Sequence, residues 1–168
     1  ITDRHFETDV RINSGSFGNL PAGEIWCGPV ENSANGVLMV DGTIGDIGQV
    51  KRPLKITVKD GRIASLECED KGLVSQVREL ASIDAMADVI GELGIGTNPV
   101  ARLVGNMLED EKAGGTSHIA FGNNMDMPGG QNNSDTHRDF LFYKPTFEVT
   151  RKDGKKHIVM REGVITGL

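Results

Sequence analysis

Apolar and polar residues alternate over short stretches along most of the chain, a pattern typical of half-buried β-strands. The clearest example is the pair of segments 54–58 and 62–67, which the turn sequence Lys59-Asp60-Gly61 joins into a β-hairpin. Asp153-Gly154 repeats this arrangement between the segments 146–150 and 157–161. Further strands are predicted, in chain order, at residues 9–14, 24–27, 36–40, 116–121 and 140–143.

Two stretches carry the apolar spacing or the end signals of α-helices. Asp70 is a suitable N-cap, and apolar residues recur at helical spacing after it: Leu73, Val74, Val77, Leu80 and Ala81. A second helix is predicted from Asn98-Pro99, a cap followed by proline in the first turn, towards Glu111. Together these elements predict a single α+β domain over residues 1–168, mostly antiparallel and with two or three helices.

Length, charge and cysteine content narrow the class of protein. A chain of 168 residues suffices for one domain with its own core, and a net charge of −6 argues against a nucleic-acid partner. Cys27 and Cys68 form neither a disulfide framework nor a CxxC motif, so we expect buried thiols in a reducing compartment. We expect no signal peptide, no membrane partner and a cytoplasmic location, because the apolar runs are far shorter than a membrane span.

Glycine is unusually frequent, at 22 of the 168 residues, and many glycines flank polar residues, as in Gly91-Glu92. One explanation is a large number of tight turns between short strands. The other is that the backbone must approach another group closely at several places. Glycine content alone does not separate these two explanations.

Two histidines lie on predicted strands and could bind a metal ion. On a strand, residues two apart point to the same face, so His137 and Asp139 could reach one ion together. His118 would share a face with Ala120, opposite Phe121. Two histidines and one carboxylate suffice to hold a catalytic divalent cation. Taken singly, each residue also fits an ordinary surface or hydrogen-bonded structural position, whereas His5 and His157 have no ligand-like context.

Two glutamates lie in unusually apolar surroundings. Glu92 has few charged neighbours in the sequence, and Glu24 directly precedes Ile25-Trp26-Cys27. Because glutamate is seldom buried without a partner, such positions favour a cation nearby, although an edge position with the carboxylate in solvent remains the simpler explanation. Glu111 lies in a run of charged residues, and local composition alone predicts that its side chain is exposed to solvent.

Five short segments occur in the order seen in the aminopeptidase T family of metallo-aminopeptidases, which this chain resembles. They are the segment 19–24 (NLPAGE), the segment 91–98 (GELGIGTN), Asp110-Glu111-Lys112, the segment 118–122 (HIAFG) and His137-x-Asp139. The resemblance runs from about residue 8 to residue 147 and corresponds to the C-terminal, metal-binding portion of that family. It therefore implies that an N-terminal domain of the family's usual architecture is missing here.

The resemblance implies a two-cation site. Its ligands would be Glu24, Glu92, Glu111, His118, His137 and Asp139, with Glu92 as the bridge between two divalent cations such as Zn²⁺, Co²⁺ or Mg²⁺. Two such cations polarise a scissile carbonyl and activate water at neutral pH. The implied function is a metal-dependent aminopeptidase in which Glu92 has a catalytic role, with a peptide or other small molecule as substrate and a homodimer as the assembly.

The sequence departs from the family at two places. Family members carry a tyrosine shortly after the histidine of the segment 118–122, where it can stabilise the tetrahedral intermediate, and Met125 stands there instead. Tyr143, the only tyrosine of the chain, is the candidate catalytic substitute, although a strand tyrosine is more often a packing residue. The second departure is the glycine-rich stretch between Glu111 and His118, which is slightly longer than in the family and bears on the assignment of Glu111 as a ligand.

Two other functions stay open at this level. The same superfamily resembles a ring-cleaving dihydroxypyridine dioxygenase, whose Fe²⁺ would need only His118, His137 and Asp139. The hydrolase is favoured because Glu24 and Glu92 would overcharge a site for a single iron. The third possibility is a non-catalytic scaffold of the same fold.

Overall fold

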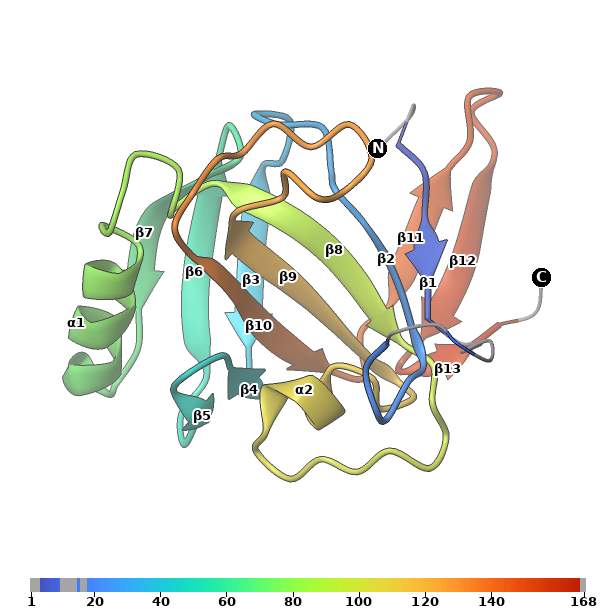
Figure 1. Ribbon diagram of the computed structural model, residues 1–168, viewed down its shortest axis with the longest axis horizontal. Helices are drawn as coiled ribbons and strands as arrows, with labels where there is room; N and C mark the ends of the chain where they lie inside the picture. The colour runs from blue at the N-terminus through green and yellow to red at the C-terminus, as the bar shows by residue number, and fades with distance from the viewer. Residues whose placement is uncertain (1–3, 10–14, 16–17, 167–168) are drawn as a thin grey trace.

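The protein is built around a seven-stranded sheet, seen in a computed structural model that describes residues 4–9, 15 and 18–166 (Figure 1). Its strand order is β1-β2-β8-β9-β10-β4-β5, and every neighbouring pair is antiparallel. The strands are β1 (Glu7–Thr8), β2 (Glu24–Cys27), β4 (Thr43–Ile44), β5 (Gly48–Gln49), β8 (Ile90–Gly96), β9 (Thr116–Gly122) and β10 (His137–Tyr143). The strands predicted at 24–27, 116–121 and 140–143 are thereby confirmed, whereas most of the strand predicted at 9–14 lies outside the described residues.

Two smaller sheets contain the predicted hairpins. One has the order β3-β6-β7, formed by β3 (Gly36–Val40), β6 (Leu54–Lys59) and β7 (Arg62–Glu67). The other has the order β11-β12-β13, formed by β11 (Phe147–Thr150), β12 (Lys156–Arg161) and β13 (Val164–Ile165). Both hairpin predictions are confirmed. In the first turn Asp60 and Gly61 have φ of 49° and 75°, the left-handed conformation that Asp-Gly turns favour.

The first predicted helix is confirmed and the second is wrong in its extent. The helix α1 (Lys71–Leu80) begins after Asp70, whose carboxylate accepts a hydrogen bond from the Leu73 amide at 3.0 Å. The helix α2 covers only Met107–Asp110 and starts at Asn106, not at Asn98. Asn98 still accepts hydrogen bonds from the next backbone amides, but the chain then runs as a loop to residue 106.

The loop before α2 is held by a buried carboxylate, which explains why no helix forms there. Asp110 is fully buried and accepts hydrogen bonds from the amides of Val104 and Gly105 at 2.7 and 3.0 Å. These amides therefore have partners without a helical ladder. The strand-rich, mostly antiparallel α+β prediction agrees with the two helices and three sheets of the described residues.

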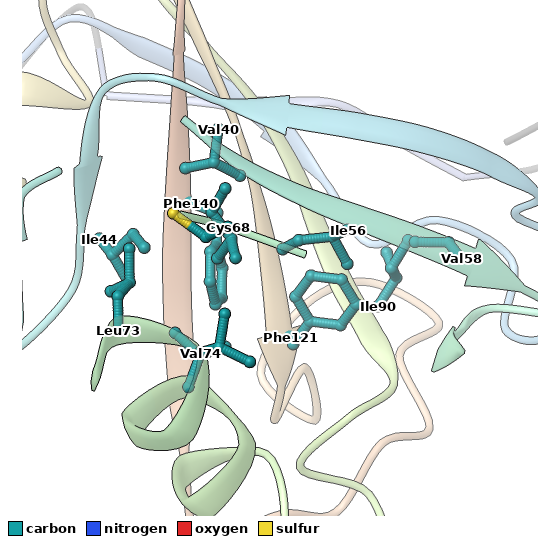
Figure 2. Packing of buried hydrophobic residues seen from close by; sticks show 12 residues of the cluster. Val40, Ile44, Ile56, Val58, Cys68, Leu73, Val74, Ile90, Phe121 and Phe140 are labelled. Atoms are coloured by element: carbon teal, nitrogen blue, oxygen red, sulfur yellow. The ribbon is translucent and has the colours of Figure 1, made fainter. Parts of the chain in front are cut away.

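The hydrophobic core lies between one face of the main sheet, the β3-β6-β7 sheet and α1 (Figure 2). Phe121 of β9 and Phe140 of β10 meet edge to face, with ring centroids 5.4 Å apart. They pack with residues of the smaller sheet and the helix: Val40, Leu54, Ile56, Val58, Leu73, Val74 and Val77. Side chains alternate along a strand, so the residues next to Phe121 on β9 and next to Phe140 on β10 point to the opposite face of the main sheet. The polar cluster lies on that face.

Two further features of the described residues bear on the expectations above. Cys27 and Cys68 are both free thiols and both buried. No helix in the part of the chain described here is long and apolar enough to cross a bilayer.

Candidate metal centre

Strands β2, β8, β9 and β10 lie next to one another in the main sheet (Figure 1). They present polar side chains on the face of this sheet opposite the core. The register of strand pairing determines which of these side chains lie side by side. Ala120 of β9 lies between Glu92 of β8 and Asp139 of β10, as both are its cross-strand partners. The small methyl group of Ala120 leaves space between these two carboxylates. Segments far apart in the sequence are thus brought to one place by sheet register.

His118 lies two residues before Ala120 on β9, and a glycine on β8 leaves space for its imidazole ring. Its cross-strand partner is Gly94, and a Cβ at Gly94 would lie only 2.0 Å from His118 Nε2. His118 is fully buried, with Nε2 2.8 Å from Glu24 Oε1. The alternation predicted for β9 is correct, because His118 and Ala120 face the cluster while Phe121 faces the core.

A second glycine admits Glu111 to the cluster. A Cβ at Gly96 would lie 2.1 Å from the Ala113 carbonyl oxygen and 2.8 Å from that of Glu111. The segment after α2 therefore packs directly on β8. Glu111 is buried, and the structure groups its carboxylate with His118 and Asp139. At Gly94 and Gly96, close approach explains the glycine, which is the second of the two explanations offered by the sequence.

Glu92 lies between the two histidines. Its Oε1 is 3.4 Å from His118 Nε2, and its Oε2 is 3.0 Å from His137 Nε2. The carboxylate is buried, with a residue exposure of 6%. Each oxygen of this one side chain therefore faces a different imidazole.

A backbone contact orients His137. Its Nδ1 lies 2.7 Å from the Asn123 carbonyl oxygen, which can only accept, so Nδ1 carries the proton and donates. Nε2 is then directed at Glu92 and at Asp139, whose Oδ1 is 3.6 Å away. Metal-binding histidines commonly donate their second nitrogen to a carbonyl in this way.

Lys112 also belongs to the cluster, although the sequence analysis did not identify it as a site residue. The side chain is fully buried, and its Nζ lies 2.8 Å from Glu24 Oε2 and contacts Glu111 Oε1. In the sequence, Lys112 ends a charged run that is typical of a solvated surface. The signal that could have found it is its place in the Asp110-Glu111-Lys112 segment of the family resemblance.

The acidic groups of the metal-free cluster have strongly shifted pKa values. Burial raises the pKa of Glu92, but hydrogen bonds and attraction from His118 and His137 outweigh it and lower the pKa to about 2. Burial, then repulsion from Asp139 and Glu24, raises the pKa of Glu111 to about 7. Glu92 is therefore ionised at neutral pH, whereas Glu111 is close to its midpoint.

The histidines are shifted in the opposite sense to ordinary buried imidazoles. Burial lowers the pKa of His137, but hydrogen bonds with Asp139 and Glu92 outweigh it and raise the pKa to about 11. The pKa of His118 is also raised, because contacts with Glu24 and Glu92 outweigh its burial. Without a metal, the carboxylates thus hold protons on the imidazoles, and a cation that binds there releases them.

The donor set fits divalent cations. Three groups of described residues have ligand atoms within 4.8 Å of one another: Glu24, Glu92 and His118; Glu92, His137 and Asp139; Glu111, His118 and Asp139. Imidazole nitrogen and carboxylate oxygen are the donors that Zn²⁺, Co²⁺ and Mn²⁺ accept. The structure therefore brings together all six residues that the sequence suggested as metal ligands.

The cluster opens into a cavity of about 1030 Å³. Glu24, Glu92, Glu111, Lys112, His137 and Asp139 all line it, and around them lie Trp26, Asp126, Met127, Asp135 and Thr136. Met125, at the position where the family carries tyrosine, also lines the cavity and is 55% exposed. The imidazole of His137 is one-third exposed on this side, at 33%, so a ligand can reach the cluster from the cavity.

Tyr143, the suggested catalytic substitute, is not brought to the cluster. Its hydroxyl accepts a hydrogen bond from Gln49 Nε2 at 3.3 Å, and it does not line the cavity. The reason is its place on the strand. Tyr143 is four residues beyond Asp139 on β10, which corresponds to about 13 Å of extended chain.

Comparison with known proteins gives one family. The family described as thermophilic metalloprotease (M29) matches residues 6–165, almost the whole chain. No curated protein matches the chain significantly.

Two solved structures share the fold. The wild-type AmpT from Thermus thermophilus is 23% identical with a TM-score of 0.79, over 98% of this chain and 45% of that one. The 2,5-dihydroxypyridine dioxygenase from Pseudomonas putida KT2440 is 17% identical with a TM-score of 0.67, over 88% of this chain and 44% of that one. The chain therefore spans less than half the length of either structure.

Proposed function

This chain belongs to the thermophilic metalloprotease (M29) family, and we propose that it is the metal-binding domain of a two-cation, aminopeptidase-like hydrolase. The observation that carries the proposal is the position of Glu92. It belongs to both the group with Glu24 and His118 and the group with His137 and Asp139, and each of its oxygens faces one histidine. A carboxylate in this position suits a bridge between two neighbouring cations.

Under this proposal, the ligands divide between two sides of the cluster. Glu24 and His118 would hold one cation, His137 and Asp139 would hold the other, and Glu92 would be shared by both. Glu111 is grouped with both His118 and Asp139, and it is assigned to the His118 side because Lys112 pairs it with Glu24. Asn123 positions His137 through its carbonyl oxygen, which keeps Nε2 free of a proton when a cation binds.

The chemistry follows from the donor set and the cavity. Two divalent cations, when bound, supply Lewis acidity towards a carbonyl oxygen and an activated water at neutral pH. The chain supplies the anionic surroundings that Asp126 and Asp135 extend to the cavity wall. A peptide that enters with its protonated amino terminus is attracted to these carboxylates, which favours cleavage of the first peptide bond over an internal one.

The proposed test uses the chain reconstituted separately with Zn²⁺, Co²⁺ and Fe²⁺. Release of free amino acids from short peptides with Zn²⁺ or Co²⁺, without oxygen uptake, supports the hydrolase. Because Met125 cannot donate a hydrogen bond to an oxyanion, we expect turnover about 10²–10³-fold below that of an enzyme with such a donor. Glu92→Gln should abolish the cleavage. Metal binding without any peptide cleavage would contradict the aminopeptidase proposal.

One observation favours a second candidate, a ring-cleaving dioxygenase with a single Fe²⁺. Asp139 Oδ1 lies 3.9 Å from His118 Nε2 and 3.6 Å from His137 Nε2, so two histidines and one carboxylate converge. This donor set suffices for a non-haem iron oxygenase. Oxygen uptake with Fe²⁺ and an aromatic diol, together with silence towards peptides, would establish this alternative in place of the hydrolase.

A further inference from the structure

Lys112 is a buried cation inside the candidate metal centre that no ligand role explains. It is the largest fully buried side chain of the described residues. Its Nζ contacts Glu24 Oε2 at 2.8 Å and Glu111 Oε1, so its charge is directed at two of the six metal-binding candidates. An ammonium group is seldom buried unless it is paired, and here its pairing partners are themselves ligands.

The contacts of Lys112 divide the cluster into two unequal sides. Glu24 and Glu111 each give one carboxylate oxygen to Lys112, which leaves one oxygen each for a metal. The free oxygen of Glu24, Oε1, is the one that faces His118. Within the described part of the chain, no ion pair joins Lys112 to Glu92 or Asp139, so the side formed by Glu92, His137 and Asp139 keeps its carboxylate oxygens.

A fixed positive charge affects the two sides differently. On the His118 side it neutralises part of the carboxylate charge and repels a divalent cation over a few ångströms through a poorly polarisable interior. On the His137 side it makes no ion pair with a ligand among the described residues. In the metal-free chain, the same charge offsets repulsion between two buried carboxylates, which is otherwise costly.

We propose that Lys112 is a resident counter-cation: it holds Glu24 and Glu111 together without metal and weakens divalent-cation binding on the His118 side relative to the His137 side. This inference rests on the proposed two-cation site. It makes Lys112 a positioning residue that acts through the two glutamates. The metal on the His118 side is then the labile one, bound second and lost first.

The test compares the wild-type chain with Lys112→Met and Lys112→Arg. Zn²⁺ binding is titrated against a competing chelator, metal content is measured by elemental analysis, and thermal unfolding is recorded with and without Zn²⁺. The wild type should show two separated dissociation constants. In K112M the weaker constant should tighten by about tenfold or more, because a repelling charge is removed, while the tighter constant changes by less than about threefold. K112R keeps the charge and should behave as the wild type.

Stability supplies a second readout that a ligand-holding role alone would not produce. Metal-free K112M should unfold at a lower temperature than metal-free wild type, yet Zn²⁺ should raise its unfolding temperature by more. His118→Ala should remove the weaker constant and His137→Ala the tighter one, which identifies the sides even if K112M does not fold without metal.

Three outcomes would overturn the inference while leaving the proposed two-cation site in place. Unchanged constants in K112M would show that the charge has no effect on the metal. Loss of both constants in K112M would show that Lys112 only holds the ligands in place. A weaker constant that disappears in His137→Ala instead would show that the labile side is the other one. If the wild type itself binds no divalent cation, the proposed function fails, and this inference fails with it.

Discussion

Substitution of Gly94 by alanine tests the candidate metal centre without altering any ligand. The added Cβ would lie 2.0 Å from His118 Nε2 and 2.1 Å from Cε1, whereas an ordinary contact needs at least 3.4 Å. The imidazole must therefore move by about 1.4 Å, the difference between 3.4 and 2.0 Å, or β8 and β9 must separate. Metal sites tolerate displacements of only about 0.2 Å in ligand distance. We expect G94A to lose the cation that His118 holds and to be destabilised by about 1–3 kcal/mol through overpacking.

A double-mutant cycle with His118→Ala separates the steric effect from a general loss of stability. In the H118A background the ring is absent, and the methyl group added by G94A occupies the vacated space. The destabilisation caused by G94A should then largely disappear, giving a coupling free energy of about 1–3 kcal/mol in denaturant unfolding. Gly45→Ala is the matched control, because a Cβ there meets atoms of Arg138 and Asp139 only at ordinary distances of 3.5–3.8 Å.

Two results would refute this reasoning. If G94A retained both cations at wild-type affinity, His118 would not be a ligand in the geometry described. If G94A were as destabilising in the H118A background as in the wild type, the strain would arise elsewhere on β8. Elemental analysis and unfolding of the four chains in the cycle, with G45A alongside, decide between these outcomes.

The other predictions concern the ligands and pH. Alanine at His137 or Asp139 should remove the tightly bound cation and leave only the weakly bound one, which dialysis removes, so that elemental analysis finds no retained metal. Alanine at the exposed His5 or His157 should leave the metal content intact. Equal metal content in all four variants would return His137 and Asp139 to ordinary surface roles. The pKa of Glu111 rises from 4.5 in the unfolded chain to about 7 in the metal-free fold, so protonated Glu111 contributes stability at low pH that is lost as pH rises between these values. Over this interval of about 2.5 pH units, at about 1.4 kcal/mol per unit, the free energy of unfolding should fall by roughly 3–4 kcal/mol. Urea unfolding in the presence of a chelator measures this loss. A Glu111→Gln chain that lost as much would contradict the assignment.

Local elements were predictable because their causes lie within a few residues of one another. The turn Asp60-Gly61 has the left-handed conformation that its residue types favour, and Asp70 caps α1 through its own side chain. The helix expected from Asn98 failed for a non-local reason. The carboxylate of Asp110 holds the amides of the preceding loop and is itself anchored by Thr43, far away in the sequence.

The sequence by itself determined the hairpins, the first helix and the chemical identity of the metal donors, whose order along the chain pointed to the family. Only the tertiary structure decided how these donors meet. In the main sheet β2 pairs directly with β8, although five strands lie between them in the chain. The register of β8, β9 and β10 places Glu92 and Asp139 on either side of Ala120. The same register places the ring of His118 over Gly94. The tertiary structure also buries Lys112 between Glu24 and Glu111. Tyr143 lies at the far end of β10, away from the cluster. The physical reason is that turns and caps depend on nearby backbone groups, whereas these contacts depend on pairing between segments that are distant in sequence.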